Sequence, residues 1–223
     1  MRHLVIVSAG TSRPSTTRML ADSIAAGSIE RLRELDVEAT VGAVEVAPLA
    51  VEAARALVTG VPSAELQAAI EQIAAADAVI AAAPVYKAGI NGLFKSFVDV
   101  LDDDLLIAKP VVLAATAGSS RHALVVDEQM RSLFAYMRAL TMPTSVFAAP
   151  EDWGSTDLGE RVQRAATELA VVIQRQIEQG IADRGWSGYQ HEFAGNATRA
   201  EQTAADVDFD SPLMRLAAGG RRS

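Results

Sequence analysis

Short apolar runs alternate with longer stretches of helical periodicity along most of the chain. Runs rich in valine, isoleucine and alanine, such as residues 77–82, are typical of buried strands. In the longer stretches, such as residues 17–35, apolar residues recur every three or four positions, which indicates helices. The predicted strands are residues 4–7, 37–46, 77–82, 111–115 and 144–148, and the predicted helices are residues 17–35, 63–76, 91–101, 124–140 and 158–180. Residues 48–60 fit either a short helix or a loop.

This alternation of strands and helices predicts an α/β fold. Strands that are joined through helices pair in parallel by right-handed crossovers, and the helices then cover both faces of the sheet. The chain has 223 residues, of which 50% are hydrophobic, and this is enough for one such domain and a tail. The composition changes after Gly185. We therefore expect a domain over residues 1–185 and an irregular C-terminal tail over residues 186–223, which can pack on a partner subunit.

Charge and cysteine content exclude several classes of function. The formal net charge is −8 and no basic stripe is present, which argues against nucleic-acid binding. The absence of cysteine excludes disulfides and thiolate chemistry. No apolar stretch reaches membrane-spanning length, and the first apolar run is too short for a signal peptide, so we expect a cytoplasmic protein without membrane contact. Three aspartates at residues 102–104 are expected to form a solvated loop rather than a metal site.

Three loops at the carboxyl ends of predicted strands carry candidate chemistry, because ligands of open parallel sheets bind at these ends. The first loop, residues 8–18, reads SAGTSRPSTTR and opens the first predicted helix. Its hydroxyls, the unpaired N–H groups of the helix and the charge of Arg13 suit a phosphate group. Serine and threonine are also ordinary helix caps, so this loop alone leaves both interpretations open. It is neither a Walker loop nor a G-x-G-x-x-G dinucleotide fingerprint.

The second loop, residues 84–95, reads PVYKAGINGLFK. Pro84 is expected to end the central strand, and Gly89 and Gly92 allow the backbone to approach a flat ligand closely. Tyr86 can flank an aromatic ring or cover the core.

The third loop, residues 116–122, reads TAGSSRH. Thr116 can donate a hydrogen bond and Gly118 permits close approach of a ligand, while His122 is expected to start a helix and to face either the ligand or solvent. The sequence contains no H-E-x-x-H motif, no G-x-S-x-G elbow and no carboxylate cluster with metal-ligand spacing.

Taken together, the three loops resemble those of the NADPH-dependent FMN reductase family of flavodoxin-like proteins. Residues 84–95 resemble the family's P-x-Y-x-x-x-x-x-G-x-L-K pattern, and residues 115–124 resemble its third flavin-side loop. The first loop resembles the family's G-S-x-R-x-x-S phosphate loop, but residues 9–12 depart from it in the spacing of the first serine. The resemblance spans residues 1–180. It implies a flavodoxin-like three-layer α/β/α sandwich with a five-stranded parallel sheet.

The resemblance also implies an FMN-binding oxidoreductase that takes electrons from NADPH or NADH. The implied FMN-binding residues are Ser12, Arg13, Ser15, Thr16 and Thr17 at the phosphate, Pro84, Val85, Tyr86, Lys87, Ala88 and Gly89 along the ring, and Thr116, Ala117, Gly118 and His122 on its other side. No catalytic side chain and no metal are implied, because hydride passes directly from nicotinamide to flavin. A homodimer or homotetramer is implied, with helix 91–101 either at the interface or in its own core. Reduced FMN is implied to serve a partner flavin-dependent monooxygenase.

Other functions stay open from the residues alone. An NAD(P)H:quinone or azo reductase with bound FMN would use the same flavin pocket, and no motif identifies the electron acceptor. A flavodoxin-type electron carrier is a candidate of another class, although the first loop lacks the T-x-T-G-x-T form of the carriers. A protein that binds another phosphate-bearing ligand is a further alternative.

Overall fold

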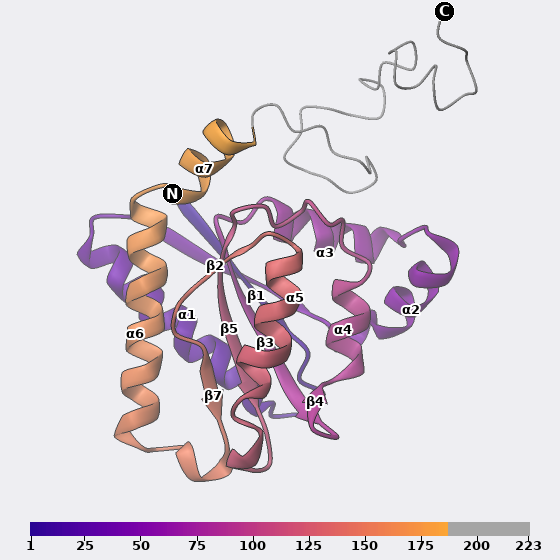
Figure 1. The fold of residues 1–223 in the computed structure, drawn as a ribbon, viewed down its shortest axis with the longest axis horizontal. Helices are drawn as coiled ribbons and strands as arrows, with labels where there is room; N and C mark the ends of the chain where they lie inside the picture. The colour runs from indigo at the N-terminus through magenta and orange to yellow at the C-terminus, as the bar shows by residue number, and fades with distance from the viewer. Residues whose placement is uncertain (187–223) are drawn as a thin grey trace, which may run out of the picture.

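A parallel β-sheet forms the centre of residues 1–186, the part of the chain that the computed structural model describes (Figure 1). Its strands are β1 (Arg2–Ser8), β2 (Ala39–Glu45), β3 (Ala78–Tyr86), β4 (Gly89–Ile90), β5 (Pro110–Thr116), β6 (Leu140–Thr141) and β7 (Val146–Ala148). The order is β2-β1-β3-β5-β6, with β7 also parallel to β5, so β6 and β7 share the last position beside β5. This is the flavodoxin-like doubly wound order. The predicted fold class with five parallel strand positions is confirmed, and the short β4 adds an antiparallel hairpin to it.

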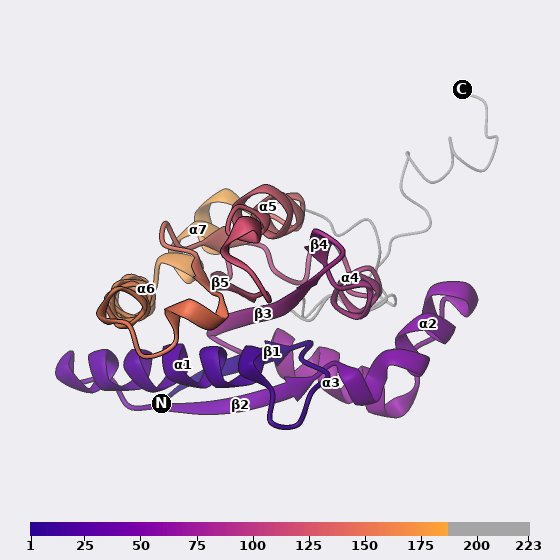
Figure 2. The ribbon, with the colours of Figure 1, turned by 90° about the horizontal axis from the view of Figure 1, so that it is seen from below.

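Helices cover both faces of the sheet (Figure 2). They are α1 (Thr16–Glu34), α2 (Ala50–Thr59), α3 (Ala64–Ala74), α4 (Gly92–Val98), α5 (Arg131–Tyr136), α6 (Thr156–Gln174) and α7 (Ile177–Gly185). α1 and α6 lie side by side on one face, and α3, α4 and α5 lie on the other. α2 resolves the open choice for residues 48–60 in favour of a helix. None of the helices in residues 1–186 is long and apolar enough to cross a bilayer.

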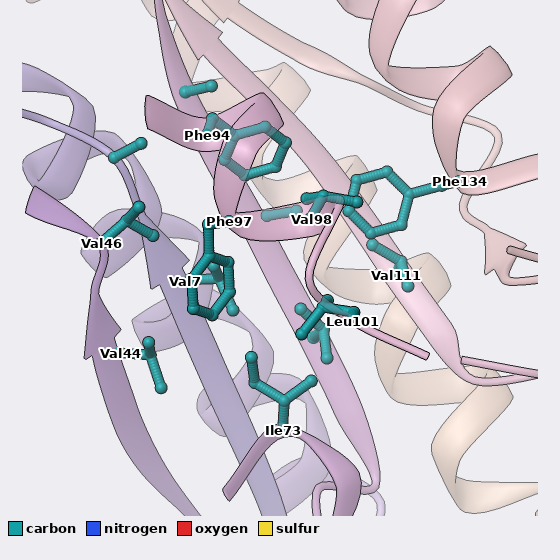
Figure 3. Close-up of a cluster of buried hydrophobic side chains, with 14 of the residues drawn as sticks. Val7, Val44, Val46, Ile73, Phe94, Phe97, Val98, Leu101, Val111 and Phe134 are labelled. Carbon is teal, nitrogen blue, oxygen red and sulfur yellow. The ribbon is translucent and has the colours of Figure 1, made fainter. Parts of the chain in front are cut away.

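The strand pattern divides the core into two layers. Leu4 and Ile6 of β1 pack with α1 and α6, whereas Val5 and Val7 pack with α3, α4 and α5. This follows from the alternation of side chains along a strand. In the second layer the ring centroids of Phe94 and Phe134 lie 6.3 Å apart. Figure 3 shows the two rings on neighbouring elements of this layer. The apolar face of α4 is therefore buried in its own core, which settles the alternative in which this face formed an interface.

Several boundaries differ from the sequence prediction. β3 continues through Pro84 instead of ending there. The pairing of β3 with β1 ends at Ala82, so the N–H that proline lacks at position 84 would have had no partner in β1. The helix predicted for residues 124–140 begins with a π-helical turn (Val126–Met130) and ends at Tyr136. The last predicted helix is broken at Gln176, whose φ is +51°. Apart from Trp186, the predicted tail lies outside the described residues.

The aspartates at residues 102–104 are not a solvated run. Asp104 is buried and forms an ion pair with Arg138 at 2.5 Å, and Asp103 accepts a hydrogen bond from the Tyr136 hydroxyl at 3.0 Å. The Asp103 carboxylate raises the pKa of Tyr136 above its ordinary value, chiefly through this hydrogen bond. The acidic residues therefore join the end of α4 to α5. Within residues 1–186, no group of histidine and acidic side chains is arranged to hold a metal.

Candidate functional site

The three predicted loops meet at the carboxyl edge of the sheet. The strand order reverses between β1 and β3, and this is the point where open α/β sheets form their ligand crevice. The first loop leaves β1, the hairpin leaves β3, and the third loop leaves β5, so the loops are neighbours in the same order as their strands. Direct hydrogen bonds described below join the first loop to each of the other two.

The first loop ends as the N-terminus of α1. Ser15 is the N-cap, and its hydroxyl accepts a hydrogen bond from the Arg18 N–H at 3.2 Å. Gly10 makes this turn possible, because a Cβ at that position would lie 1.9 Å from the Ser15 hydroxyl oxygen. The N–H groups of Thr16 and Thr17 have no partner among residues 1–186. The first turn contains no acidic side chain, so two amides and the positive end of the helix dipole are available to an anion.

Two arginines border this loop, and they differ in availability. Arg18 is held by Asp22, at 2.7 Å, and by Glu45. Its pKa is raised, first by the hydrogen bond to Asp22 and then by Glu45, although partial burial acts in the opposite direction. Arg13 is exposed and makes no ion pair with any described carboxylate. Of the two arginines, Arg13 is therefore the one whose guanidinium is available to contact a phosphate, as predicted for it from the sequence.

A buried hydrogen bond connects α1 to β5. The hydroxyl oxygens of Thr17 and Thr116 lie 2.7 Å apart, and the two residues are 2% and 5% exposed. Both were predicted to bind a ligand through their hydroxyls. Because one hydroxyl donates to the other, only one O–H of the pair remains free to donate. The pair thus mainly fixes the start of α1 to the start of the third loop.

Replacing Thr116 with valine should lower the free energy of unfolding by about 1–3 kcal/mol, because the buried Thr17 hydroxyl loses its partner at nearly unchanged volume. Urea denaturation followed by circular dichroism measures this change. Thr144→Val is not a matched control, because the Thr144 hydroxyl donates a hydrogen bond to the Glu168 carboxylate. Thr167→Val is suitable, because this exposed hydroxyl only bonds the carbonyl of its own helix. A loss at Thr116 no larger than that at Thr167 would contradict the role of the bridge.

The second loop is a tight β-hairpin. β3 and β4 pair as Val85 with Ile90 and Tyr86 with Gly89, leaving Lys87 and Ala88 as the two turn residues. The Tyr86 side chain is 49% exposed, and its hydroxyl lies 2.7 Å from the Thr11 hydroxyl of the first loop. The hairpin therefore borders the first loop directly. Thr11 was not among the predicted residues, since no motif distinguishes it from the hydroxyls that follow.

Asn91 joins the hairpin to the first loop. It is 1% exposed, and its amide nitrogen donates to the Ala9 carbonyl at 3.0 Å. Its amide oxygen accepts from the Phe94 N–H at 3.3 Å and caps α4, while its own N–H donates to the Pro84 carbonyl at 3.0 Å. The sequence prediction did not include this residue. An asparagine before a helical run is a capping signal, but the contact with Ala9 cannot be read from it.

The third loop is held at both ends and open in the middle. The Ala117 N–H donates to the Ala148 carbonyl at 3.1 Å, and the Ser120 N–H donates to the Glu151 carboxylate at 3.3 Å. Hydrogen bonds from its own N–H and from Ser120 lower the pKa of Glu151, so it stays charged. A Cβ at Gly118 would have no neighbour within 4 Å, which leaves space for a ligand there. His122 ends a single 3₁₀ turn (Ser120–His122) rather than starting a helix.

The predicted residues differ in whether a side chain or only the backbone is available to a ligand at the edge. Three have buried or half-buried side chains, namely Pro84, Val85 and Ala117, and the last two pack in the hydrophobic core. A ligand at the edge can therefore contact mainly their backbone. The residues with exposed side chains or an open backbone at the edge are Ser12, Arg13, Thr16, Tyr86, Lys87, Ala88 and Gly118. The arrangement combines an anion site at the start of α1 with two backbone-lined loops. It can bind a phosphorylated, flat molecule.

Comparisons with known proteins find similar sequences and structures among flavin reductases. A sequence model for a family described as NADPH-dependent FMN reductase matches residues 1–154. A Pseudomonas aeruginosa protein named FMN reductase (NADPH) is 37% identical over 180 residues, which cover 78% of this chain and 94% of that protein. A Pseudomonas putida protein named NADH-dependent FMN reductase SfnE is 38% identical over 180 residues, covering 77% and 91%. The solved structure of an oxidoreductase from Corynebacterium diphtheriae has a TM-score of 0.76 at 42% identity, covering 78% and 98%.

Proposed function

The chain belongs to the NADPH-dependent FMN reductase family and is an NAD(P)H-dependent oxidoreductase that reduces FMN; we propose that it binds the flavin on the three loops of the carboxyl edge. The phosphate lies at the first loop, and the ring lies between the hairpin and the third loop. The single observation that carries this proposal is the start of α1. Two unpaired amides and the free guanidinium of Arg13 stand there together without an acidic neighbour in the first turn.

The donor set fits the phosphate of FMN. The N–H groups of Thr16 and Thr17 and the remaining hydroxyl donors of Ser12, Ser15 and Thr16 are all suited to bind phosphate oxygens. Arg13 adds a charge-assisted hydrogen bond, which is about twice as strong as a neutral one.

The backbone of the other two loops fits the ring. Lys87 and Ala88 leave the hairpin turn exposed, and Gly118 has open space where a side chain would project. Tyr86, half exposed beside Thr11, flanks the ring between the phosphate loop and the turn. His122 is half-buried on the far side and can bond the ring edge.

The chain contributes binding and orientation to the reaction. Bound FMN supplies the hydride acceptor, and NADPH or NADH supplies the hydride. The loops fix one edge of the ring, so that the nicotinamide can stack on the exposed face in a reactive geometry. No side chain needs to gain or lose a proton at the reacting atoms, because hydride passes directly from the nicotinamide to the flavin.

We further propose that the reduced flavin leaves the enzyme and serves a partner flavin-dependent monooxygenase. The exposure of the loops supports release, because the described residues 11–14 and 86–88 leave the edge open to solvent. A quinone or azo reductase would instead keep FMN bound throughout turnover. An electron carrier would not oxidise NADPH at all.

One experiment separates these possibilities. The purified protein is titrated with FMN, followed by absorbance, and NADPH and NADH oxidation is then measured with and without free FMN. We expect saturable FMN binding and oxidation that rises with free FMN. Oxidation supported only by bound FMN, with ping-pong kinetics towards a quinone, would replace the proposal by the quinone reductase. Failure to bind FMN would refute the site.

We also propose that the protein is a homodimer or homotetramer, in which the tail of residues 186–223 packs on a partner subunit as a unit separate from the domain over residues 1–185. Support comes from α2 and the segment after it, where Val51, Val58 and Val61 are 76%, 88% and 66% exposed. Such apolar exposure is typical of surfaces that other chains cover. Light scattering on the full chain and on a chain that ends at residue 185 tests this. A monomeric full chain, or an unchanged assembly after truncation, would contradict it.

A further inference from the structure

The hairpin after β3 adopts a turn that its residues do not favour by themselves. Both turn residues have positive φ, +51° at Lys87 and +64° at Ala88. Two-residue hairpin turns of this kind are normally built from Asn-Gly or Asp-Gly, because residues with a Cβ rarely adopt the left-handed conformation. Neighbouring contacts must therefore hold this turn in place.

Gln129 makes contacts of this kind. Its side-chain oxygen accepts a hydrogen bond from the Ile90 N–H at 3.0 Å, and its side-chain nitrogen donates to the Ala88 carbonyl at 3.4 Å. Both bonds lie on the β4 side of the hairpin, one at the second turn residue, Ala88, and one at Ile90 of β4. Gly89 lies between them, and a Cβ there would come 3.1 Å from the glutamine oxygen, so glycine permits this close approach. Gln129 thus acts as a clamp on the hairpin.

Gln129 is carried by a turn that is anchored in the hydrophobic core. Gln129 belongs to the π-helical turn Val126–Met130, in which both Val126 and Met130 are fully buried in the core. π-Helical turns are rare and occur frequently at functional sites. The buried side chains of Val126 and Met130 fix the π-helical turn in the core, and this turn fixes Gln129 beside the hairpin.

We infer that Gln129 is a positioning residue for the flavin ring. By holding the turn in its left-handed conformation, it keeps the backbone of residues 87–89 at the ring edge. The inference rests on the proposed function, in which this hairpin borders the ring. It predicts that loss of the clamp weakens binding of the ring itself, independently of the phosphate.

The test compares FMN with riboflavin, which has the same ring and no phosphate. Flavin fluorescence is titrated with the full-length, flavin-free protein carrying Gln129→Ala, Gln129→Glu or Gln67→Ala. Gln67 is the control, because it is a half-buried glutamine whose side chain donates a hydrogen bond to Glu71 within α3, away from the hairpin. Gln129→Glu keeps an acceptor for the Ile90 N–H but loses the donor to Ala88.

We expect Gln129→Ala to raise the Kd of FMN and of riboflavin by the same factor, about five- to tenfold for two hydrogen bonds. Gln129→Glu should lose less, and Gln67→Ala should match the unchanged protein. Equal Kd values for Gln129→Ala and the unchanged protein, or a loss confined to FMN, would overturn the inference. A Gln129→Glu variant as weak as Gln129→Ala would overturn the role of the Ile90 bond. If the unchanged protein binds neither flavin, the proposed function itself fails.

Discussion

Replacing Arg13 with alanine is expected to weaken FMN binding by about 10- to 100-fold and to leave riboflavin binding unchanged. A hydrogen bond to a charged group contributes about 1.5–3 kcal/mol, and each 1.4 kcal/mol corresponds to a factor of ten in Kd. Arg13 is the exposed cation of the first loop without a carboxylate partner among residues 1–186, so the whole of its charge is available to the phosphate. Riboflavin lacks that phosphate and serves as the internal reference. Fluorescence titration at a fixed salt concentration measures both Kd values.

Arg33→Ala is the matched control for this variant. Arg33 lies in the last turn of the same helix that Arg13 precedes, and its removal changes the net charge by the same amount. A general electrostatic effect would weaken FMN binding in both variants, and it would fall with added salt. Weakening of FMN and riboflavin to the same degree in Arg13→Ala would instead show that Arg13 shapes the loop. An unchanged Kd for FMN would exclude the phosphate contact.

The order of strands and helices could be predicted because burial on both faces of a parallel sheet leaves a strong pattern in the sequence. β3 illustrates this, since every residue from Ala78 to Val85 is buried. The end of the same strand was predicted wrongly. The prediction treated Pro84 as a strand terminator, but proline is excluded only where the missing N–H would face a partner strand. The sequence does not tell where β1 ends relative to β3.

The loops of the site could be located from the sequence, but the contacts that shape them could not. The hydroxyls of Thr17 and Thr116 are separated by 99 residues, and the Asn91 side chain contacts the Ala9 carbonyl across 82 residues. Each of these residues has an ordinary local explanation as a cap or a loop hydroxyl. Only the register of β1, β3 and β5 brings the partners together. Sequence reasoning therefore finds the loops through their composition and misses the residues that connect them.

The π-helical turn is a second example of the same limit. Residues 124–140 have the apolar spacing of a helix, and this spacing does not distinguish an α-helical from a π-helical first turn. The difference decides which side chain faces the hairpin. Gln129 was consequently absent from the predicted site.

Replacing Asn91 with alanine is expected to lower the free energy of unfolding by about 2–4 kcal/mol, the largest effect on stability that we expect from a residue of the site. The loss of a helix N-cap costs about 1 kcal/mol, and a buried polar group left without a partner costs about 1–3 kcal/mol. Asn91→Ala removes the cap of α4 and leaves the Ala9 carbonyl without its side-chain partner. Urea denaturation with an unchanged m value measures the loss.

Asn91→Ser separates the two contributions, because serine caps a helix as well as asparagine but is too short to keep the amide contact with Ala9. We expect Asn91→Ser to recover about 1 kcal/mol relative to Asn91→Ala, and the deficit that remains to report the Ala9 bond. This bond holds the residue directly before the glycine of the first loop, while the N–H of the same asparagine holds the hairpin strand at Pro84. FMN binding should therefore weaken in both variants, although neither touches the flavin. Full recovery of stability and FMN affinity in Asn91→Ser would show that the cap alone matters and that the two loops are not coupled through Asn91.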